Sequence, residues 1–235
     1  MDSNRDHIFA SWSISLANRT ARPIQGGTAY MIVIIDYNVG NVRSVCNAFR
    51  HIGCDVELSS DAEWIEQASG LVLPGVAAFG YAVRALASTA AVVKKAALAG
   101  KPLLGICVGY QMLFDHSCEY GRHTGLGLVS GSVVPIPAGR TIPHMGWNLV
   151  KPAQDMDLFD GLGGEKRFYF AHSYYAGVTD ESSKVAYTDY GFKLPASVQK
   201  SNIYGVQFHP EKSGKAGLTV LRNFAEICET GSRKC

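Results

Sequence analysis

The sequence predicts an α/β fold: a single domain with a central, mostly parallel sheet flanked by helices, to which antiparallel hairpins are added. First, short apolar runs alternate with helical patterns from Met31 to about residue 120, which implies parallel strands with helices on both faces. Second, the chain after about residue 121 changes to short strands punctuated by Gly and Pro, as in antiparallel hairpins. Third, 235 residues with 47% hydrophobic content are enough for one substantial core.

Composition excludes several classes of function. A net charge of +2 gives no reason to expect nucleic acid or an anionic membrane as partner. No stretch approaches the roughly 18 apolar residues of a membrane span. The cysteines lack the Cys-x-x-Cys and His-x(3–5)-His spacings of zinc sites, so no metal or other cofactor is predicted. Their low density is unlike a secreted disulfide scaffold, and we therefore expect a cytoplasmic protein with free thiols.

Residues 1–30 differ from the rest of the chain. They carry scattered Ser, Arg and Asn, a Gly26-Gly27 pair, and no sustained helical or strand period. The brief apolar run at residues 8–16 is too short and too polar for a secretory signal. We expect an extension at 1–30, poorly ordered, and a folded domain over 31–235.

The elements of the first half follow from apolar runs and their stop signals. Strands are expected at residues 32–35, 55–58, 70–73 and 102–106. Helices are expected at 42–52, from a Ser60-Asp61 cap through 67, at 81–98, and from Val108 onward. Gly53 and Gly100 mark two of the helix ends.

The second half is expected to add short strands and one closing helix. The predicted strands are at residues 127–135, 147–151, 167–171, 185–188, 196–200 and 203–208. A final helix over 217–229 has core spacing at Leu218, Leu221, Phe224, Ala225 and Cys228.

Cys107 occupies the corner between the strand at 102–106 and the following helix, with Gly105 and Gly109 on either side. A nucleophile on such a corner needs this Gly-x-Nuc-x-Gly spacing, because the flanking positions crowd together. The helix N-terminus favours the reactive thiolate, and the free N–H of Val108 can stabilise an oxyanion. A buried structural thiol is the alternative interpretation.

A second segment, Phe208-His209-Pro210-Glu211, supplies a partner for the thiol. Pro210 keeps His209 in extended geometry, so His209 and Glu211, two apart, are expected side by side. Glu211 would orient the imidazole while His209 takes the thiol proton. Taken alone, this segment could be only a capped loop; together with Cys107 it predicts a catalytic triad.

Gly-Ile-Cys107-Val-Gly-Tyr-Gln111 and Gly-Val-Gln-Phe-His209-Pro-Glu211 resemble the two signatures of class I, triad-type glutamine amidotransferases. Within that class, the stretches at 35–44, 73–80, 143–148 and 208–213 are similar to the glutaminase subunits of imidazole glycerol phosphate synthase. The resemblance runs from Met31 to about Glu229.

The resemblance implies that Cys107 attacks the γ-carboxamide of L-glutamine, giving a glutamyl thioester and ammonia, and that water then releases glutamate. Gln111 and the backbone around Ser173 and Tyr174 would bind the amino-acid end of glutamine, and Gly75 belongs to the oxyanion loop. The ammonia would pass to a (β/α)₈-barrel cyclase subunit in a heterodimer, which makes imidazole glycerol phosphate and aminoimidazole carboxamide ribotide in histidine biosynthesis.

One departure concerns that loop: the family usually carries Pro-Gly-Val-Gly, and this chain has Ala77 in the last place. If the active state needs a positive φ there, alanine would add about 1 kcal/mol. Three alternatives stay open at this stage: a free-standing γ-glutamyl hydrolase, a paralogous glutaminase for sugar amidation, and a non-enzymatic scaffold. Direct chemical roles for His144 and Trp147 are not predicted.

Overall fold

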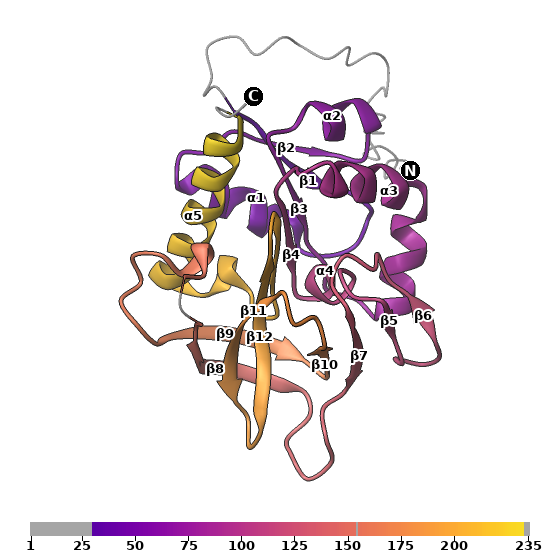
Figure 1. Ribbon diagram of the computed structural model, residues 1–235, viewed down its shortest axis with the longest axis vertical. Coiled ribbons are helices and arrows are strands. Elements are labelled where there is room, and N and C mark those ends of the chain that lie inside the picture. The colour runs from indigo at the N-terminus through magenta and orange to yellow at the C-terminus, as the bar shows by residue number, and fades with distance from the viewer. Residues whose placement is uncertain (1–29, 154, 233–235) are drawn as a thin grey trace, which may run out of the picture.

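The computed structural model describes residues 30–153 and 155–232. The predicted extension at 1–30 lies outside them except for Tyr30. Figure 1 shows the helices around the upper part of a large sheet and the antiparallel strands below. No helix in these two ranges is long and apolar enough to cross a membrane.

The main sheet contains nine strands within the described residues, in the order β2-β1-β3-β4-β13-β12-β11-β8-β9. Its first five strands are mutually parallel and short: β1 (Ile32–Ile35), β2 (Val56–Ser59), β3 (Gly70–Leu73), β4 (Leu103–Ile106) and β13 (Ile203–Val206). Every residue of β1, β3, β4 and β13 is buried. Such runs are typical of parallel strands covered on both faces.

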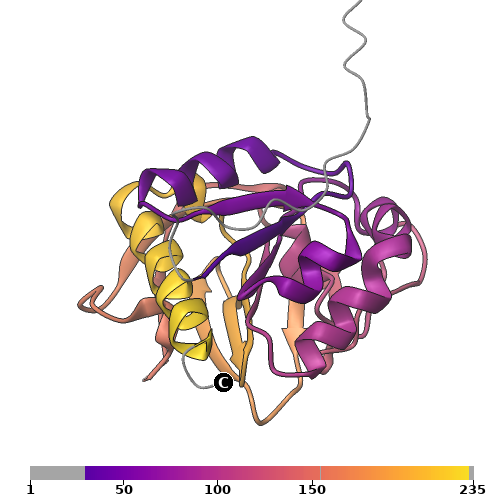
Figure 2. The same ribbon diagram turned by 90° about the horizontal axis from the view of Figure 1, so that it is seen from above.

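Helices cover both faces of the parallel part. They are α1 (Val42–His51), α2 (Ala62–Gln67), α3 (Phe79–Leu98), α4 (Val108–Gln111) and α5 (Gly214–Ser232). Figure 2 shows α1 and α5 on one face and α2 and α3 on the other. Asp61 caps α2 through a hydrogen bond from Glu63 N to its Oδ1 at 3.0 Å, as the sequence predicts.

The antiparallel part continues the same sheet. It contains β12 (Lys193–Lys200), β11 (Lys184–Asp189), β8 (His144–Lys151) and β9 (Lys166–His172), and the short turns η1 (Asp157–Phe159) and η2 (Pro210–Lys212) connect to it. A separate four-stranded sheet contains β10 (Tyr174–Val178), β7 (Gly131–Pro135), β5 (His116–Ser117) and β6 (His123–Thr124).

The sequence-based prediction of an α/β fold with a mostly parallel centre is confirmed, with two differences. The segment at 203–208, grouped with the antiparallel strands by its composition, pairs parallel with β4 on one side and antiparallel with β12 on the other. The added strands extend the main sheet rather than only wrapping around its end. Periodicity cannot distinguish these arrangements, because strand order depends on contacts between distant residues.

Candidate active site

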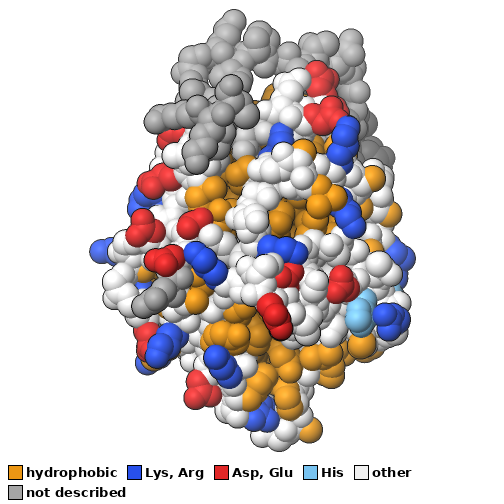
Figure 3. Space-filling model, viewed as in Figure 1, with side chains coloured by type: hydrophobic (Ala, Val, Ile, Leu, Met, Phe, Trp, Pro, Cys, Tyr) orange, Lys and Arg blue, Asp and Glu red, His pale blue; other side chains and the backbone are white. Residues whose placement is uncertain are grey.

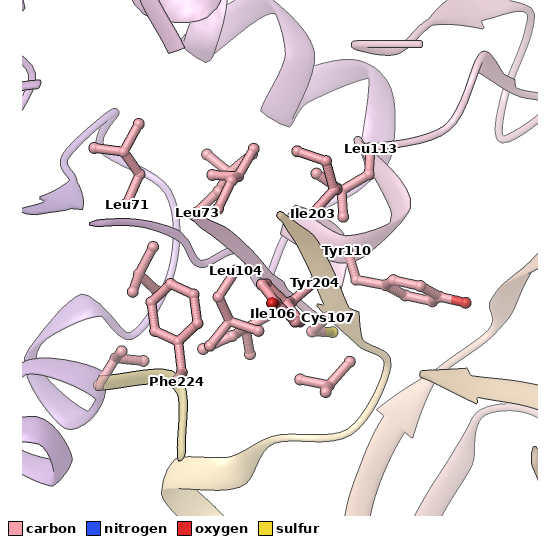
Figure 4. Packing of buried hydrophobic residues seen from close by; sticks show 14 of the residues in the cluster. Leu71, Leu73, Leu104, Ile106, Cys107, Tyr110, Leu113, Ile203, Tyr204 and Phe224 are labelled. Atoms are coloured by element: carbon pink, nitrogen blue, oxygen red, sulfur yellow. The ribbon is translucent and has the colours of Figure 1, made fainter. Parts of the chain in front are cut away.

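Cys107 lies where β4 turns into α4, and its backbone is in the left-handed region, with φ 56° and ψ −110°. The crowding expected at this corner is present. A Cβ added to Gly109 would lie 1.7 Å from Leu73 O, and one added to Gly105 would lie 2.6 Å from Gly109 O. Figure 4 shows Cys107 at the end of β4. The fold therefore holds a non-glycine residue in a strained conformation, as functional sites often do.

The helix after Cys107 is shorter than expected. Helix α4 contains four residues, and the chain then continues in turns through Phe114. Because a macrodipole is a sum over aligned peptide units, so short a helix contributes less to thiolate stabilisation than the sequence-based argument assumes.

Parallel pairing between β4 and β13 brings the second segment to the thiol. Val206 aligns with Ile106, and Cys107 N donates a hydrogen bond to Val206 O at 2.9 Å. The chain therefore leaves both strands at the same edge of the sheet, the edge at which open α/β sheets bind their ligands. His209 follows three residues after Val206 in an extended conformation, with φ −99° and ψ 97°.

His209 and Glu211 form a buried pair. His209 Nδ1 lies 2.9 Å from Glu211 Oε1, and both side chains are almost completely buried. Glu211 lies in the turn η2 rather than in an extended segment, so the turn after Pro210, and not strand geometry, brings the carboxylate back to the ring. Ser213 Oγ donates to His209 O at 2.6 Å and holds the turn closed.

The electrostatics of this pair favour a charged imidazole. Burial lowers the pKa of His209, but hydrogen bonds from its ring to Cys107 and Glu211, and the negative charges of those two groups, raise it more, to about 10. A proton on the ring is thus stabilised by a carboxylate on one side and a thiolate on the other. This is the electrostatic arrangement of a Cys-His-Glu triad.

The oxyanion loop is in a closed conformation. Val108 N donates a hydrogen bond to Gly75 O at 3.3 Å, so the N–H predicted to stabilise an oxyanion is already occupied. Tyr37 Oη donates to Pro74 O and holds the same loop. A Cβ on Gly75 would lie 2.6 Å from Tyr37 Oη. Ala77, half-buried, is not in the left-handed region in this state.

Of the residues predicted to bind the amino-acid end of glutamine, two are joined by a hydrogen bond. Gln111 Nε2 donates to Tyr174 O at 2.9 Å and to Gln207 Oε1 at 3.0 Å. Ser173 O accepts a hydrogen bond from Ile136 N at 3.0 Å and is therefore engaged with the small sheet. The structure brings Gln111 and Tyr174 together, and places the Ser173 carbonyl away from them.

Two residues near the site were missed by the sequence-based prediction. Gln207 is completely buried, and its Nε2 lies 3.9 Å from Cys107 Sγ. Its position within Gly-Val-Gln-Phe-His209 was a signal that the prediction left unused. Glu119 accepts a hydrogen bond from Phe79 N, the start of α3, at 2.6 Å, and its negative charge helps, after burial, to raise the pKa of Tyr174.

Two histidines that were given no chemical role form a second buried pair. His144 Nδ1 lies 2.9 Å from His172 Nε2, and His172 Nδ1 lies 2.8 Å from Tyr174 O. The ring of His144 stacks on Tyr190, with centroids 3.9 Å apart. Burial lowers the pKa of His144 to about 4. Burial is also the main reason why the pKa of His172 is lowered to about 3. Both rings are therefore neutral near pH 7.

Comparison with known proteins places this geometry in a family. The family model for glutamine amidotransferase class-I matches residues 33–228. Solved structures with the same fold include a glutamine amidotransferase with a TM-score of 0.68 and 21% identity, covering 83% of this chain and 98% of that one. The structure of PurLQS from Thermotoga maritima has a TM-score of 0.67 and 22% identity, covering 84% and 98%.

Curated relatives are more similar. The imidazole glycerol phosphate synthase subunit HisH of Methanothermobacter thermautotrophicus is 49% identical over 84% of this chain and 98% of that protein. The same subunit of Lacticaseibacillus casei is 47% identical, over 85% of this chain and 97% of that one. The chain thus belongs to the class-I glutamine amidotransferases and, within them, to the family of the imidazole glycerol phosphate synthase subunit HisH.

Proposed function

We propose that this chain is the glutaminase subunit of imidazole glycerol phosphate synthase and that it hydrolyses L-glutamine at Cys107. The observation that carries the proposal is the parallel pairing of β4 with β13, which sets the strained Cys107 against the buried His209–Glu211 pair. A Cys-His-carboxylate constellation of this kind is an activated nucleophile with a matched acid and base.

The reaction follows from these groups. The Cys107 thiolate attacks the γ-carboxamide carbon, an S–C bond forms, and the carbonyl oxygen becomes an oxyanion. Protonated His209 gives its proton to the departing nitrogen, the C–N bond breaks, and ammonia leaves a glutamyl thioester. Neutral His209 then takes a proton from water as the water attacks the thioester, which releases glutamate and the thiolate. Glu211 holds the ring and stabilises its charged form.

Two side chains of the site can interact with the α-ammonium group of glutamine. Both amide protons of Gln111 are committed to Tyr174 and Gln207, so the group it has left for a ligand is the acceptor Oε1, which suits the α-ammonium of glutamine. The nearby Glu119 carboxylate adds a negative charge for the same ammonium. The carbonyl oxygens of Ser173 and Tyr174 already accept hydrogen bonds within the chain, so a substrate contact at these two residues would use other backbone groups.

The closed oxyanion loop implies low activity for the chain alone. While Gly75 O occupies the Val108 N–H, the developing oxyanion has one donor fewer, and one such donor contributes about 100-fold or more to the rate. The peptide at Gly75 must rotate before turnover becomes fast. Activation by a partner would act at this step.

The partner would be a (β/α)₈-barrel cyclase subunit that forms a heterodimer with this chain in the cytoplasm. Strand β8 offers a docking surface: Met145, Trp147 and Leu149 are 64%, 52% and 41% exposed, and they alternate with less exposed residues. Figure 3 shows hydrophobic side chains gathered over the lower part of one face, where the antiparallel strands lie in Figure 1. Exposed apolar patches of this kind mark protein interfaces. Direct transfer would keep the ammonia from being protonated in solvent.

The test is glutamate release from glutamine by the chain alone and then with the cyclase and its ribonucleotide ligand. We expect low basal release that rises by orders of magnitude only in the full mixture. Cys107→Ala should abolish synthesis from glutamine and leave synthesis from ammonium intact. Equal release with and without cyclase would overturn the proposal in favour of a free-standing γ-glutamyl hydrolase. Activation by a different barrel partner would point to sugar amidation.

A further inference from the structure

Gln207 follows β13 directly and is completely buried, and its amide faces the nucleophile. Its Nε2 lies 3.9 Å from Cys107 Sγ, at the long end of an N–H···S hydrogen bond. The triad and the glutamine-binding set together leave this side chain without a role. Which end of its amide faces the sulfur decides what it does, since nitrogen donates and oxygen accepts.

The orientation of that amide can be deduced from a chain of buried hydrogen bonds, beginning at Tyr174 O. A carbonyl oxygen only accepts, so His172 Nδ1, 2.8 Å away, must carry the proton. Neutral His172 then has a bare Nε2, which accepts from His144 Nδ1 at 2.9 Å. Burial lowers the pKa of both rings, in agreement with two neutral tautomers linked in one direction.

The same carbonyl sets the direction of the next two links. Gln111 Nε2 gives one proton to Tyr174 O and the other to Gln207 Oε1, at 2.9 and 3.0 Å. The oxygen of Gln207 is therefore turned to Gln111, and its nitrogen is turned to the sulfur. A flipped Gln207 amide would place its NH₂ group against that of Gln111, so the Gln111 proton that now bonds Gln207 Oε1 would lose its acceptor, which is costly in a buried site.

We propose that Gln207 is a further catalytic residue, which donates an amide N–H to the Cys107 sulfur, and that His172 is a positioning residue acting on it through Tyr174 and Gln111. The inference rests on the proposed glutaminase function and adds a group to its machinery. A neutral donor directed at the sulfur favours the thiolate over the thiol and restrains its direction of attack. It does so without adding a charge beside the His209–Glu211 pair.

The experiment measures the rate at which iodoacetamide alkylates Cys107 in the full chain, as a function of pH, with mass spectrometry of the Cys107 peptide as readout. Gln207→Met keeps the shape of the side chain and removes the donor, and we expect alkylation to slow about fivefold. Gln207→Glu places an acceptor and a negative charge beside the sulfur and should slow the thiolate-dependent reaction further. In turnover, both variants should lower kcat more than they raise KM.

Gln199→Met is the matched control. Gln199 is also a buried glutamine, on the adjacent strand β12, and its amide bonds with Asp157, at 2.9 and 2.7 Å. The Gln199→Met variant should lose about as much stability as Gln207→Met, and its Cys107 should be alkylated at the rate of the parent. Parental alkylation in Gln207→Met, or equal slowing in Gln199→Met, would overturn the role of Gln207.

A double-mutant cycle tests His172. If His172 acts through the amide, Gln207→Met should slow alkylation less in a His172→Phe background than in the parent, whereas additive effects would refute the relay. The alkylation readout needs neither glutamine nor cyclase. Failure of this inference is therefore distinguishable from failure of the glutaminase function, which Cys107→Ala turnover tests separately.

Discussion

The two halves of the nine-stranded sheet differ in the length and burial of their strands. In the parallel half, β1, β3 and β4 have four residues each, all buried between helices. In the antiparallel half, β8 has eight residues and alternates between exposed and more buried positions. Strands of the first kind have no side chain on the protein surface. Strands of the second kind keep one face exposed, where side chains can contact another molecule.

Because of this difference, the proposed catalytic residues and the proposed docking surface lie in different parts of the sheet. Cys107, the proposed nucleophile, follows β4, where close packing leaves little room for larger side chains. The exposed apolar side chains lie on β8, where packing constrains them less. Strand β13 pairs with strands of both halves, and His209 and Glu211 follow its last residue by three and five positions. We expect substitutions in the parallel half to affect folding and catalysis together, and those at the exposed apolar positions of β8 to affect binding alone.

The largest expected effect is at the corner of the parallel half. Gly109→Ala would place a Cβ 1.7 Å from Leu73 O, a backbone atom that cannot move aside. We expect a loss of about 3 kcal/mol or more in the free energy of unfolding, with loss of glutaminase activity, measured by urea titration and glutamate release. Gly177→Ala in β10 is the control, because its Cβ meets Ser132 O at an ordinary 3.6 Å. Equal effects would refute the contrast between the two regions.

The next effect concerns binding. Trp147→Ala should leave the unfolding midpoint nearly unchanged, because 52% of the residue is exposed, and should weaken cyclase binding by about 2 kcal/mol, as for an aromatic anchor at an interface. Isothermal titration calorimetry would measure it. Leu98→Ala, at the exposed end of α3, should leave binding unchanged. Unaltered affinity in the Trp147 variant would remove β8 as the docking surface.

The pKa of His209 is shifted in the opposite direction from the pKa values of His144 and His172. The pKa of His209 is raised in the folded state, so its contribution to stability is complete below about 6.5 and is lost as pH rises towards 10. The pKa values of His144 and His172 are lowered, so the unfolded chain binds more protons between pH 6.5 and about 4, and stability falls as pH falls through that window.

His172→Gln removes one of these groups. The slope of unfolding free energy against pH below 6.5 should decrease by up to one proton, or about 1.4 kcal/mol per pH unit, in urea titrations at a series of pH values. Above about pH 7 the slopes of parent and variant should coincide, which separates titration from general destabilisation. Parallel curves in the acidic window would show that His172 is not buried as a neutral ring.

The smallest effect is in the oxyanion loop. If the open loop needs a positive φ at residue 77, Ala77→Gly should favour it by about 1 kcal/mol and raise glutamate release about fivefold. Release is measured with and without cyclase, because the partner could supply the same free energy and mask the gain. Rates identical to the parent in both settings would show that the loop opens without left-handed geometry at this position.

The parallel half was readable from the sequence because full burial leaves a simple signal. The run at 70–73 is strand β3 as predicted, and the helix at 81–98 begins only two residues earlier, at Phe79. Its early start depends on Glu119, which bonds Phe79 N from 40 residues away. A hydrogen bond between residues so far apart in the chain leaves no pattern in the local sequence.

The same limit applies to the site. The strained corner at Cys107 could be predicted from the Gly spacing, and His209 and Glu211 were predicted to lie side by side, but the turn after Pro210 that brings them together was not predicted. The motif Gly-Val-Gln-Phe-His209 marked Gln207 as a neighbour of the site, but its contacts with Gln111, 96 residues away, and with Cys107 have no local pattern. The strand β10 was also missed, since Tyr-Tyr-Ala-Gly-Val lacks the alternation of a half-buried strand, and with it the engagement of Ser173 by the small sheet.

The hydrogen bond from Val108 N to Gly75 O has a consequence for affinity as well as for rate. If the cyclase favours the open loop by some factor, thermodynamic reciprocity requires that whatever fills the open oxyanion site strengthens cyclase binding by that same factor. An adduct left on Cys107 by a glutamine analogue, with its oxygen on the freed Val108 N–H, would then hold the two proteins together. The loop would thus couple the affinity between the two proteins to the occupancy of the oxyanion site.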